Sequence, residues 1–396
     1  MKTQEKSGVR ATWAEVRTAA LTANLRALQK ELGHADLLAV VKADAYGHGA
    51  ALCAKALVGA GVKWLGVTGA SEGALVREAI AQEAGGAEAR ILLMRGVLPG
   101  EGQAVMDAHL TPVVWTLEQL DEMERAAKMQ GVQAAAHLEV DTGMSRQGVG
   151  REGLSAMLAR FKGSQMLRLE GVLTHFAAAE DEGSTQNAEQ MKALAGALEQ
   201  VRAAGLKPQW VHAGSTSTVD AGVELPGLAA LAACVGARLM CRTGLGLYGY
   251  ALELSGASAR VREGLQPVLA WKTRVLSVYE VAAGARIGYN GTVTAERPMR
   301  LALLAVGYAD GLRRELSRGG EVLIAGKRAR MVGRVSMDAT IVDVSGISEV
   351  KAGDEAVLIG EQGVERITAD DQARVAGTIA YEILCGIGAR VPRYCE

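Results

Sequence analysis

Asp36-Leu-Leu-Ala-Val-Val-Lys-Ala-Asp-Ala-Tyr-Gly-His-Gly49 joins an apolar run to a group of polar and glycine residues. The run from Leu37 to Val41 is typical of a strand buried on both faces, and Lys42 falls where that strand must reach the surface. Tyr46 follows four residues later, between glycine-rich positions that let the backbone approach a ligand. A solvated lysine at a strand end is one interpretation. If Lys42 is partly desolvated, its pKa falls and it can form a Schiff base with a carbonyl cofactor.

The composition indicates a globular protein that acts on a small molecule. The chain has 396 residues and a formal net charge of −1, so we expect two domains with sizeable cores and no basic surface for nucleic acid. The five cysteines are scattered and lack the spacing of a metal site, and no metal is expected. No apolar leader or apolar run of about 18 residues occurs, which predicts a cytoplasmic protein with no membrane partner.

Alternating strand and helix signals between Thr12 and about Gly249 predict an α/β fold. A capping-box pattern, Thr12-Trp-Ala-Glu15, predicts the start of a helix that runs to Leu32. The eight strand candidates are residues 37–42, 64–67, 91–94, 112–115, 134–140, 168–174, 209–212 and 235–242. The helical segments between them include residues 72–84, 117–130 and 185–204. Eight such βα units in roughly 240 residues predict a TIM-like (β/α)8 barrel. An open doubly wound sheet is the competing fold, and no G-x-G-x-x-G follows an early strand to support it.

The sequence changes character after about Ala251. Short stretches rich in Val, Ile and Leu, separated by Gly or Asp turns, predict strands at residues 270–279, 300–306, 321–324, 339–344 and 356–359. One last helix is predicted from Thr368 to Leu384. The expected domains are an N-terminal segment (1–11), a cofactor-binding barrel (12–250) and a mostly β C-terminal domain (251–396).

The loops after the seventh and eighth barrel strands are candidate anion sites. In barrel enzymes these loops often bind phosphate. Here they read His212-Ala-Gly-Ser-Thr216 and Arg242-Thr-Gly-Leu-Gly246, and their glycines expose backbone N–H groups. Each loop alone could be an ordinary turn and helix cap. Taken with Lys42, they predict a phosphate anchor facing a Schiff-base lysine, which is the requirement for pyridoxal phosphate.

Other polar motifs are expected near the same rim. Asp141-Thr-Gly-Met-Ser-Arg146 follows the fifth strand, and Thr174-His175-Phe176 ends the sixth. In the C-terminal domain, Gly288-Tyr-Asn-Gly291 and Gly333-Arg-Val-Ser-Met-Asp338 interrupt the strand pattern. Taken singly, these last two motifs are typical of turns.

The ordered series of motifs closely resembles that of alanine racemases. The matching segments are Val41-Lys-Ala-Asp-Ala-Tyr-Gly-His-Gly49, Asp141-Thr-Gly-Met144 with Arg146, Thr174-His-Phe176, Arg242 with Gly244 and Leu247-Tyr-Gly249, Gly288-Tyr289, Gly307-Tyr-Ala-Asp-Gly311, Gly333-Arg-Val-Ser-Met-Asp338 and Arg390-Val-Pro-Arg393. They span nearly the whole chain, and the first is highly specific.

The resemblance implies pyridoxal 5'-phosphate as cofactor and a homodimer in which each active site uses the barrel of one subunit and the C-terminal domain of the other. Lys42 would hold the cofactor and act as the base on the D face of the substrate. Tyr289 of the partner subunit would be the base on the L face, oriented by His175. Arg242 would hydrogen-bond the pyridine nitrogen, and because arginine is not deprotonated in practice, that nitrogen would stay unprotonated.

The resemblance also assigns the remaining contacts. Arg146 would bind the cofactor's phenolic oxygen and the substrate carboxylate, and the backbone N–H of Met337 would bind the same carboxylate. Asp338 is expected to support this motif. The residues expected at the phosphate are Tyr46, Thr216, Gly244, Leu245 and Tyr381.

Three positions depart from the usual pattern of the family. Glu139 stands where many relatives carry a lysine that becomes carbamylated, Ser215-Thr216 replaces Asn-Ser, and Ser336 replaces a cysteine. Since Arg146 needs an anion to fix its orientation, we predict a Glu139–Arg146 pair. The alternative is that Glu139 pairs elsewhere.

The predicted function is interconversion of L- and D-alanine, supplying D-alanine for peptidoglycan. A racemase with broader specificity, or one for serine or basic amino acids, is a second reading, because the motifs fix the chemistry better than the side-chain pocket. A pyridoxal-phosphate homeostasis protein is the non-enzymatic alternative, and its kind resembles only the first half of the chain. A decarboxylase of the same fold is a weaker rival.

Overall fold

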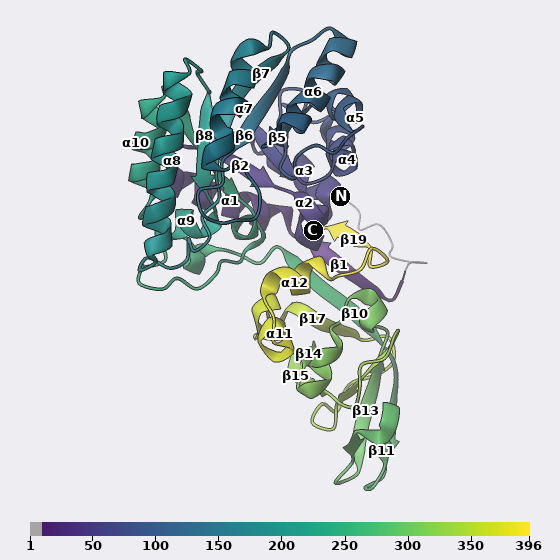
Figure 1. The fold of residues 1–396 in the computed structure, drawn as a ribbon. Helices are drawn as coiled ribbons and strands as arrows, with labels where there is room; N and C mark the ends of the chain where they lie inside the picture. Colours follow the sequence, from purple (N-terminus) through teal and green to yellow (C-terminus); the bar gives the residue numbers. More distant parts are fainter. Residues whose placement is uncertain (1–9) are drawn as a thin grey trace. The chain divides into compact units, whose positions relative to one another are not determined.

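The computed structural model describes residues 10–396, which form two compact units (Figure 1). The barrel unit contains residues 19–45 and 50–266. The C-terminal unit contains residues 267–396 together with the described residues up to Thr18 and the short segment Tyr46–Gly49.

The barrel unit confirms the predicted eight-stranded fold. Its parallel strands close in sequence order from β2 to β9, and β9 pairs with β2. The strands are β2 (Asp36–Val40), β3 (Trp64–Val67), β4 (Arg90–Leu93), β5 (Leu110–Val114), β6 (Ala134–Glu139), β7 (Leu167–Leu173), β8 (Trp210–Gly214) and β9 (Arg238–Thr243). All eight coincide with predicted strands to within a few residues, because runs buried on both faces are almost continuously apolar.

Helices surround the barrel in the order expected for βα units. They are α1 (Thr18–Leu32), α3 (Ala50–Gly59), α4 (Ala70–Ile80), α5 (Gly102–Asp107), α6 (Leu117–Gln130), α7 (Arg151–Gly163), α8 (Thr185–Ala203), α9 (Thr216–Ala221) and α10 (Leu225–Cys234). Helix α6 has the predicted bounds because both of its ends carry local signals. Thr116 and Gln119 form a capping box at its start, and Gly131 adopts the left-handed conformation after its end.

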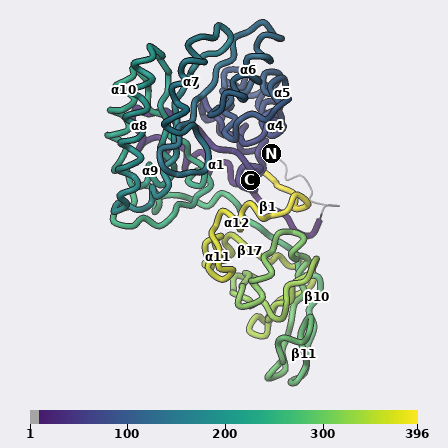
Figure 2. Tube along the Cα trace, in the orientation of Figure 1, coloured from purple at the N-terminus to yellow at the C-terminus, as the bar shows by residue number. Residues whose placement is uncertain are grey.

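The prediction of a helix starting at Thr12 is wrong. Thr12–Val16 is a strand, β1, and α1 begins at Thr18. β1 pairs antiparallel with β10 (Leu269–Val281) and parallel with β19 (Arg393–Cys395), so β1 belongs to the C-terminal unit. In Figure 2 the purple β1 accordingly lies beside the green β10. The Thr12 hydroxyl donates to the carbonyl of Lys272 instead of capping a helix. Long-range pairing has overridden the local capping signal.

The C-terminal unit is built on a nine-stranded sheet in the order β18-β17-β14-β15-β16-β13-β10-β1-β19. Its other strands are β13 (Met299–Leu304), β14 (Glu321–Ile324), β15 (Lys327–Met331), β16 (Thr340–Asp343), β17 (Glu355–Gln362) and β18 (Glu365–Ile367), with a separate hairpin of β11 (Arg286–Ile287) and β12 (Val293–Thr294). The five strands predicted here are confirmed.

The single helix predicted over 368–384 is wrong in extent. The segment forms two helices, α11 (Ala369–Ala376) and α12 (Ala380–Cys385). Gly377 lies between them with φ 74°, a left-handed conformation that ends α11.

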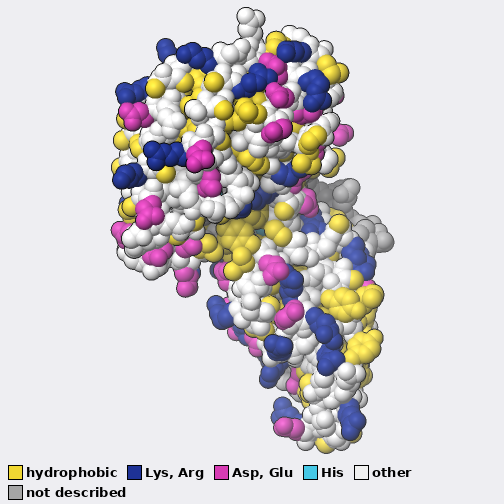
Figure 3. Space-filling model, viewed as in Figure 1, with side chains coloured by type: hydrophobic (Ala, Val, Ile, Leu, Met, Phe, Trp, Pro, Cys, Tyr) yellow, Lys and Arg dark blue, Asp and Glu magenta, His cyan; other side chains and the backbone are white. Residues whose placement is uncertain are grey.

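The surface carries charges of both signs. On the face drawn in Figure 3, lysine and arginine side chains are interspersed with aspartate and glutamate. Within residues 10–396, no helix is both long and apolar enough to cross a bilayer. The same residues contain no group of three or more His, Cys, Asp or Glu side chains arranged to hold a metal.

Candidate active site

The barrel residues predicted for the site gather at the carboxyl ends of the strands. Lys42 follows β2, Glu139 ends β6, His175 follows β7, Thr216 follows β8, and Arg242 lies near the end of β9. Parallel strands of a closed barrel place these ends on one face. The structure therefore brings together, in one unit, side chains that are up to 200 residues apart in sequence (42 to 242).

Lys42 begins an unusual left-handed turn, α2 (Lys42–Gly47). The four residues 43–46 all have φ of 53–54°, and Gly47 has φ 80°. Non-glycine residues rarely adopt this conformation, which costs of order 1 to 3 kcal/mol each. The surrounding structure must supply that free energy, and such strain clusters at functional sites. The turn directs the chain away from β2 immediately after Lys42, which is itself half-buried.

Arg242 is held by several hydrogen bonds within the barrel site. Its side chain is buried, and its two terminal nitrogens donate to four acceptors. Nη1 contacts His212 O at 3.0 Å and His212 Nδ1 at 3.2 Å, while Nη2 contacts Thr174 O at 2.9 Å and His175 Nδ1 at 2.9 Å. A guanidinium has five N–H donors, so only the Nε–H of Arg242 is left without a partner among residues 10–396.

His175 is a neutral imidazole in this setting. Burial lowers its pKa to about 3, helped by the nearby charges of Arg242, Arg146 and Lys42. Because Arg242 donates to Nδ1, the proton of the neutral ring resides on Nε2. His175 can therefore donate one hydrogen bond from Nε2 to a group in the site.

The Asp141-Thr-Gly-Met-Ser-Arg146 loop is organised around the Asp141 carboxylate. Oδ1 accepts hydrogen bonds from the backbone N–H groups of Gly143 (3.0 Å), Met144 (3.1 Å) and Ser145 (3.1 Å). Ser145 has φ 57°, so the chain turns sharply before Arg146. The Arg146 side chain is exposed.

Glu139 makes its direct hydrogen bond to Gln147, and no direct hydrogen bond joins it to Arg146 among residues 10–396. Glu139 is 4% exposed, and its Oε2 accepts from Gln147 Nε2 at 2.6 Å. Gln147 also donates to the carbonyl of Met94 at 3.2 Å. Burial raises the pKa of Glu139, although Gln147 and the charges of Arg242 and Arg146 oppose this rise. The neighbouring Gln147 therefore takes the direct contact, while Arg146 acts on Glu139 only through its charge.

The two predicted phosphate loops of the barrel lie side by side. Thr216 is 5% exposed and its hydroxyl accepts from the backbone N–H of Gly246 at 3.3 Å. A side chain at Gly246 would come within 2.8 Å of Thr216, so glycine permits this close approach. Gly244 and Leu245 precede it at the start of a 3-10 turn, η1 (Leu245–Tyr248). Backbone N–H groups at such a turn suit an anion.

Tyr46 and Tyr381, the other predicted phosphate ligands, meet in the C-terminal unit. Their ring centroids are 5.9 Å apart. Burial, with the charges of Tyr381 and Cys385, raises the pKa of Tyr46, so its hydroxyl stays a hydrogen-bond donor. Gly47 packs against α12, where a Cβ atom would lie 2.1 Å from the carbonyl oxygen of Leu384. Only glycine allows this contact between the turn and the helix that carries Tyr381.

Tyr289, Met337 and Asp338 lie on two adjoining loops of the C-terminal unit. A Cβ atom at Gly288 would be 3.3 Å from the backbone nitrogen of Arg334, which shows how closely the loops approach. Tyr289 is 67% exposed and Met337 54%. Asp338 accepts a hydrogen bond from Arg390 Nη2 at 2.6 Å, which ties the Met337 loop to the C-terminal segment.

Sequence reasoning missed the side chains that hold these groups in place. Gln190 on α8 is fully buried and joins Ala177 N, the His175 carbonyl and the Thr142 hydroxyl. Gln147 likewise has no signal of its own in one sequence, since a lone glutamine is ordinarily solvated. His212 is named only as part of a candidate phosphate loop, and its contact with Arg242 is not predicted by the sequence.

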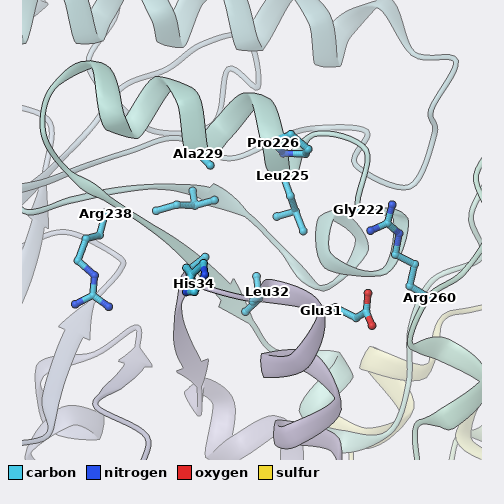
Figure 4. Close-up of a pocket in the computed structure, with 11 residues that line it drawn as sticks. Glu31, Leu32, His34, Gly222, Leu225, Pro226, Ala229, Arg238 and Arg260 are labelled. Atoms are coloured by element: carbon cyan, nitrogen blue, oxygen red, sulfur yellow. The ribbon is translucent and has the colours of Figure 1, made fainter.

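A cavity at the opposite end of the barrel strands is separate from this site. It has a volume of about 520 Å³ and lies between the end of α1 and α10, and Figure 4 shows Glu31, Leu225, Arg238 and Arg260 around it. It includes His34, just before β2, and Arg238, the first residue of β9. It therefore reaches the amino ends of these strands, whereas Lys42 and Arg242 lie at their carboxyl ends.

Comparisons with known proteins agree with the geometry. A family model described as the alanine racemase N-terminal domain matches residues 16–252, and one described as the alanine racemase C-terminal domain matches residues 268–395. An alanine racemase of Symbiobacterium thermophilum is 41% identical over 392 residues, covering 98% of this chain and 97% of that protein. The match to both halves disfavours the homeostasis-protein alternative.

Solved structures lead to the same family. The crystal structure of alanine racemase from Streptomyces lavendulae has a TM-score of 0.87 at 32% identity, covering 99% of this chain and 98% of that one. That of Bartonella henselae, with covalently bound pyridoxal phosphate, has a TM-score of 0.83 at 26% identity, covering 98% and 99%. The chain therefore belongs to the alanine racemase family of pyridoxal-phosphate-dependent isomerases.

Proposed function

We propose that this protein interconverts L- and D-alanine, with Lys42 and Tyr289 of the partner subunit as the two proton-transfer groups. The observation that carries this proposal is the state of Arg242, whose terminal nitrogens are all engaged by the protein while its Nε–H is left. This Nε–H can donate one more hydrogen bond, and the ring nitrogen of pyridoxal phosphate is an acceptor.

The residues of the barrel fit this cofactor. Lys42 supplies the amine, Arg242 the donor for the ring nitrogen, and Thr216 with the N–H groups of Gly244 and Leu245 the phosphate anchor. Tyr46 and Tyr381 are proposed as further phosphate ligands. When bound, the cofactor supplies an electron-withdrawing group that makes the α-hydrogen of the amino acid acidic.

Racemisation requires a proton to leave one face of the α-carbon and another to arrive on the opposite face. Lys42 Nζ would serve the D face and Tyr289 of the partner subunit the L face. Both amine and phenol have ordinary pKa values of about 10, which must be lowered for base catalysis near neutral pH.

His175 would prepare the tyrosine for this role. Its Nε2–H is the donor that remains after Arg242 has occupied Nδ1. A hydrogen bond from Nε2 to the phenol oxygen would stabilise the phenolate and fix its direction. Because His175 stays neutral, it can donate this bond without transferring a proton of its own.

The substrate carboxylate would be held by Arg146 and by the backbone N–H of Met337 of the partner subunit. An exposed arginine is suited to bidentate binding of a carboxylate. Asp338 would keep the Met337 loop in place through Arg390. The shared site requires a homodimer, and D-alanine for peptidoglycan in the cytoplasm is the proposed use of the product.

The test is a measurement of D/L interconversion for a panel of amino acids, with solvent deuterium entering the α-position. We expect alanine to show the highest kcat/KM from both enantiomers. Equal or higher kcat/KM for serine or a basic amino acid would favour the broader racemase, and cofactor binding without exchange would contradict the proposed activity.

A further inference from the structure

A line of buried polar side chains runs from Arg242 into the interior of the barrel. His212 on β8, His137 on β6 and Glu170 on β7 are each at most 1% exposed. His212 Nδ1 lies 3.2 Å from Arg242 Nη1, and His212 Nε2 lies 2.8 Å from His137 Nδ1. His137 Nε2 lies 3.5 Å from Glu170 Oε2. Two hydrogen bonds therefore join Arg242, His212 and His137, and the series ends in a charge contact between His137 and Glu170, because His137 Nε2 makes no hydrogen bond to the described residues.

The positions of the protons on the two histidines follow from Arg242, which can only donate hydrogen bonds. His212 Nδ1 must therefore accept, and the proton of its neutral ring lies on Nε2. That proton is donated to His137 Nδ1, which leaves the proton of His137 on Nε2, facing Glu170. If either ring carried two protons, an N–H would point at another N–H. Both histidines are therefore neutral, and every donor points away from Arg242 toward the carboxylate.

The charges around the series agree with this assignment. Burial lowers the pKa of His137 and, together with His137 and Arg242, lowers that of His212 well below its usual value. For Glu170, burial raises the pKa, but the contacts with His137 and Arg90 outweigh it and hold the pKa at about 2. Arg90 Nη2 and Arg168 Nη2 bind the Glu170 carboxylate at 2.6 and 2.7 Å. The carboxylate is thus ionised and fixed from two sides.

The residues next to His137 are restricted by the space that its ring needs. Gly171 pairs with His137 across β6 and β7, and a Cβ atom there would lie 2.6 Å from His137 Nδ1. The ladder also shifts register between Ala136 and His137. The indole rings of Trp64 and Trp210 lie 5.4 and 6.2 Å from the His137 ring. Surrounded in this way, the hydrogen bonds are strong because the local dielectric is low.

We infer that His212, His137 and Glu170 are positioning residues for Arg242, which orient its guanidinium and hold it as a donor that does not release its proton. The negative charge of Glu170 beside the His137 ring polarises the hydrogen bond between the two histidines, so His212 Nδ1 becomes a better acceptor for the arginine. The cofactor's ring nitrogen then receives a hydrogen bond but no proton. This inference rests on the proposed role of Arg242 at that nitrogen.

The first measurement reads the histidine protons directly. Protein labelled with ¹⁵N-histidine, with and without cofactor, is studied by NMR over about pH 5 to 9, with signals assigned by substitution. We expect His212 and His137 to be neutral, with the proton on Nε2, throughout. A cationic ring, or a proton on Nδ1 of either residue, would overturn the inference. This result does not depend on catalysis, so it separates the series from the proposed function.

The second measurement follows the cofactor. Glu170→Gln removes the carboxylate charge, and Glu122→Gln is the matched control, because Glu122 is 5% exposed and bound to Arg125 on the outer helix α6. With ¹⁵N-labelled pyridoxal phosphate, Glu170→Gln should shift the ring-nitrogen signal toward the protonated form and lower kcat roughly tenfold with a smaller change in KM. Glu122→Gln should do neither.

A loaded Glu170→Gln enzyme with unchanged signals from the ring nitrogen and from His212 would overturn the inference. If Glu170→Gln does not fold, the histidine protons of the unsubstituted protein decide. A protein that neither binds the cofactor nor racemises alanine would instead contradict the proposed function, whatever the state of the histidines.

Discussion

Arg242 Nη2 donates a hydrogen bond to His175 Nδ1 over 2.9 Å, and this contact fixes which ring nitrogen carries the histidine proton. Arg242 thereby determines which ring nitrogen carries the proton in both His175 and His212. Toward the site, His175 is left with an Nε2–H donor. Toward the barrel interior, His212 is left with an Nε2–H that points to His137. The chemistry expected of each histidine follows from the arginine between them.

Lys42→Ala should abolish both activity and the visible absorption of the lysine-bound cofactor, because Lys42 is the lysine proposed at the carboxyl end of β2. Lys55→Ala is the control, since Lys55 is an exposed lysine on α3. Absorption spectra of the purified proteins and a racemase assay check this. Full activity with the absorption band retained in Lys42→Ala would rule out the assignment.

Tyr289→Ala should slow α-hydrogen exchange of L-alanine by about 10²-fold or more, as expected for loss of a general base, with little effect on cofactor binding. Tyr279→Ala is a control at another partly exposed tyrosine. Exchange in deuterated solvent, followed by NMR, gives the rates.

Mixing Lys42→Ala with Tyr289→Ala subunits tests the shared site. A hybrid dimer would contain one site with both bases, so the mixture should recover part of the activity that each variant has lost. Hybrids that form but stay inactive would contradict a tyrosine supplied by the partner subunit.

Glu139→Gln should raise the KM for alanine several-fold, because Arg146 loses the nearby negative charge. The same substitution should not lower the free energy of unfolding at neutral pH. The pKa of Glu139 is raised by burial, so the folded state disfavours its charge above the unfolded pKa, and a neutral side chain removes that cost. Steady-state kinetics and urea unfolding separate the two effects, and an unchanged KM would exclude a role for the charge.

Glu139→Lys should make the enzyme dependent on bicarbonate, because a lysine could regain a negative group there by carbamylation. The unsubstituted enzyme should be indifferent to bicarbonate. Titrating bicarbonate into degassed assays of both proteins checks this, and equal responses of the two would contradict it.

The stability of the protein should fall as the pH drops below about 6.5. His175 has a pKa of about 3 in the folded chain and an ordinary value near 6.5 when unfolded. Between these values only the unfolded state binds the proton, so each such histidine costs about 1.4 kcal/mol per pH unit. His175→Asn should reduce the slope of unfolding free energy against pH by up to one proton. Near pH 8 the two plots of unfolding free energy against pH should be parallel. Plots that are also parallel at pH 5 to 6 would contradict the prediction.

The sequence alone predicted the barrel because each of its strands is a short apolar run that can be recognised without knowing its partners. A strand buried on both faces must be nearly all apolar, and β3, with predicted and observed bounds of 64–67, shows this. Lys42, His175 and Arg242 could be placed at one rim because parallel strands of a barrel end on one face. Their individual roles came from the resemblance to a family.

Only the tertiary structure decided the elements whose partners are distant in sequence. Thr12–Val16 carries a capping pattern but becomes β1 because β10 and β19 offer it hydrogen bonds. Lys327–Met331 is mostly charged, yet it forms β15 between β14 and β16. In both cases long-range pairing outweighs local preference.

In the active site, too, the properties of single residues could be read from the sequence, whereas their contacts could not. The sequence determined which residues can donate, accept or carry charge, since these are properties of each side chain. It could not show that Gln147, rather than Arg146, takes the Glu139 carboxylate, or that His212 and His137 align between Arg242 and Glu170. Those relationships depend on distances across different strands, and these are set only when the barrel closes and burial makes every unpaired polar group costly.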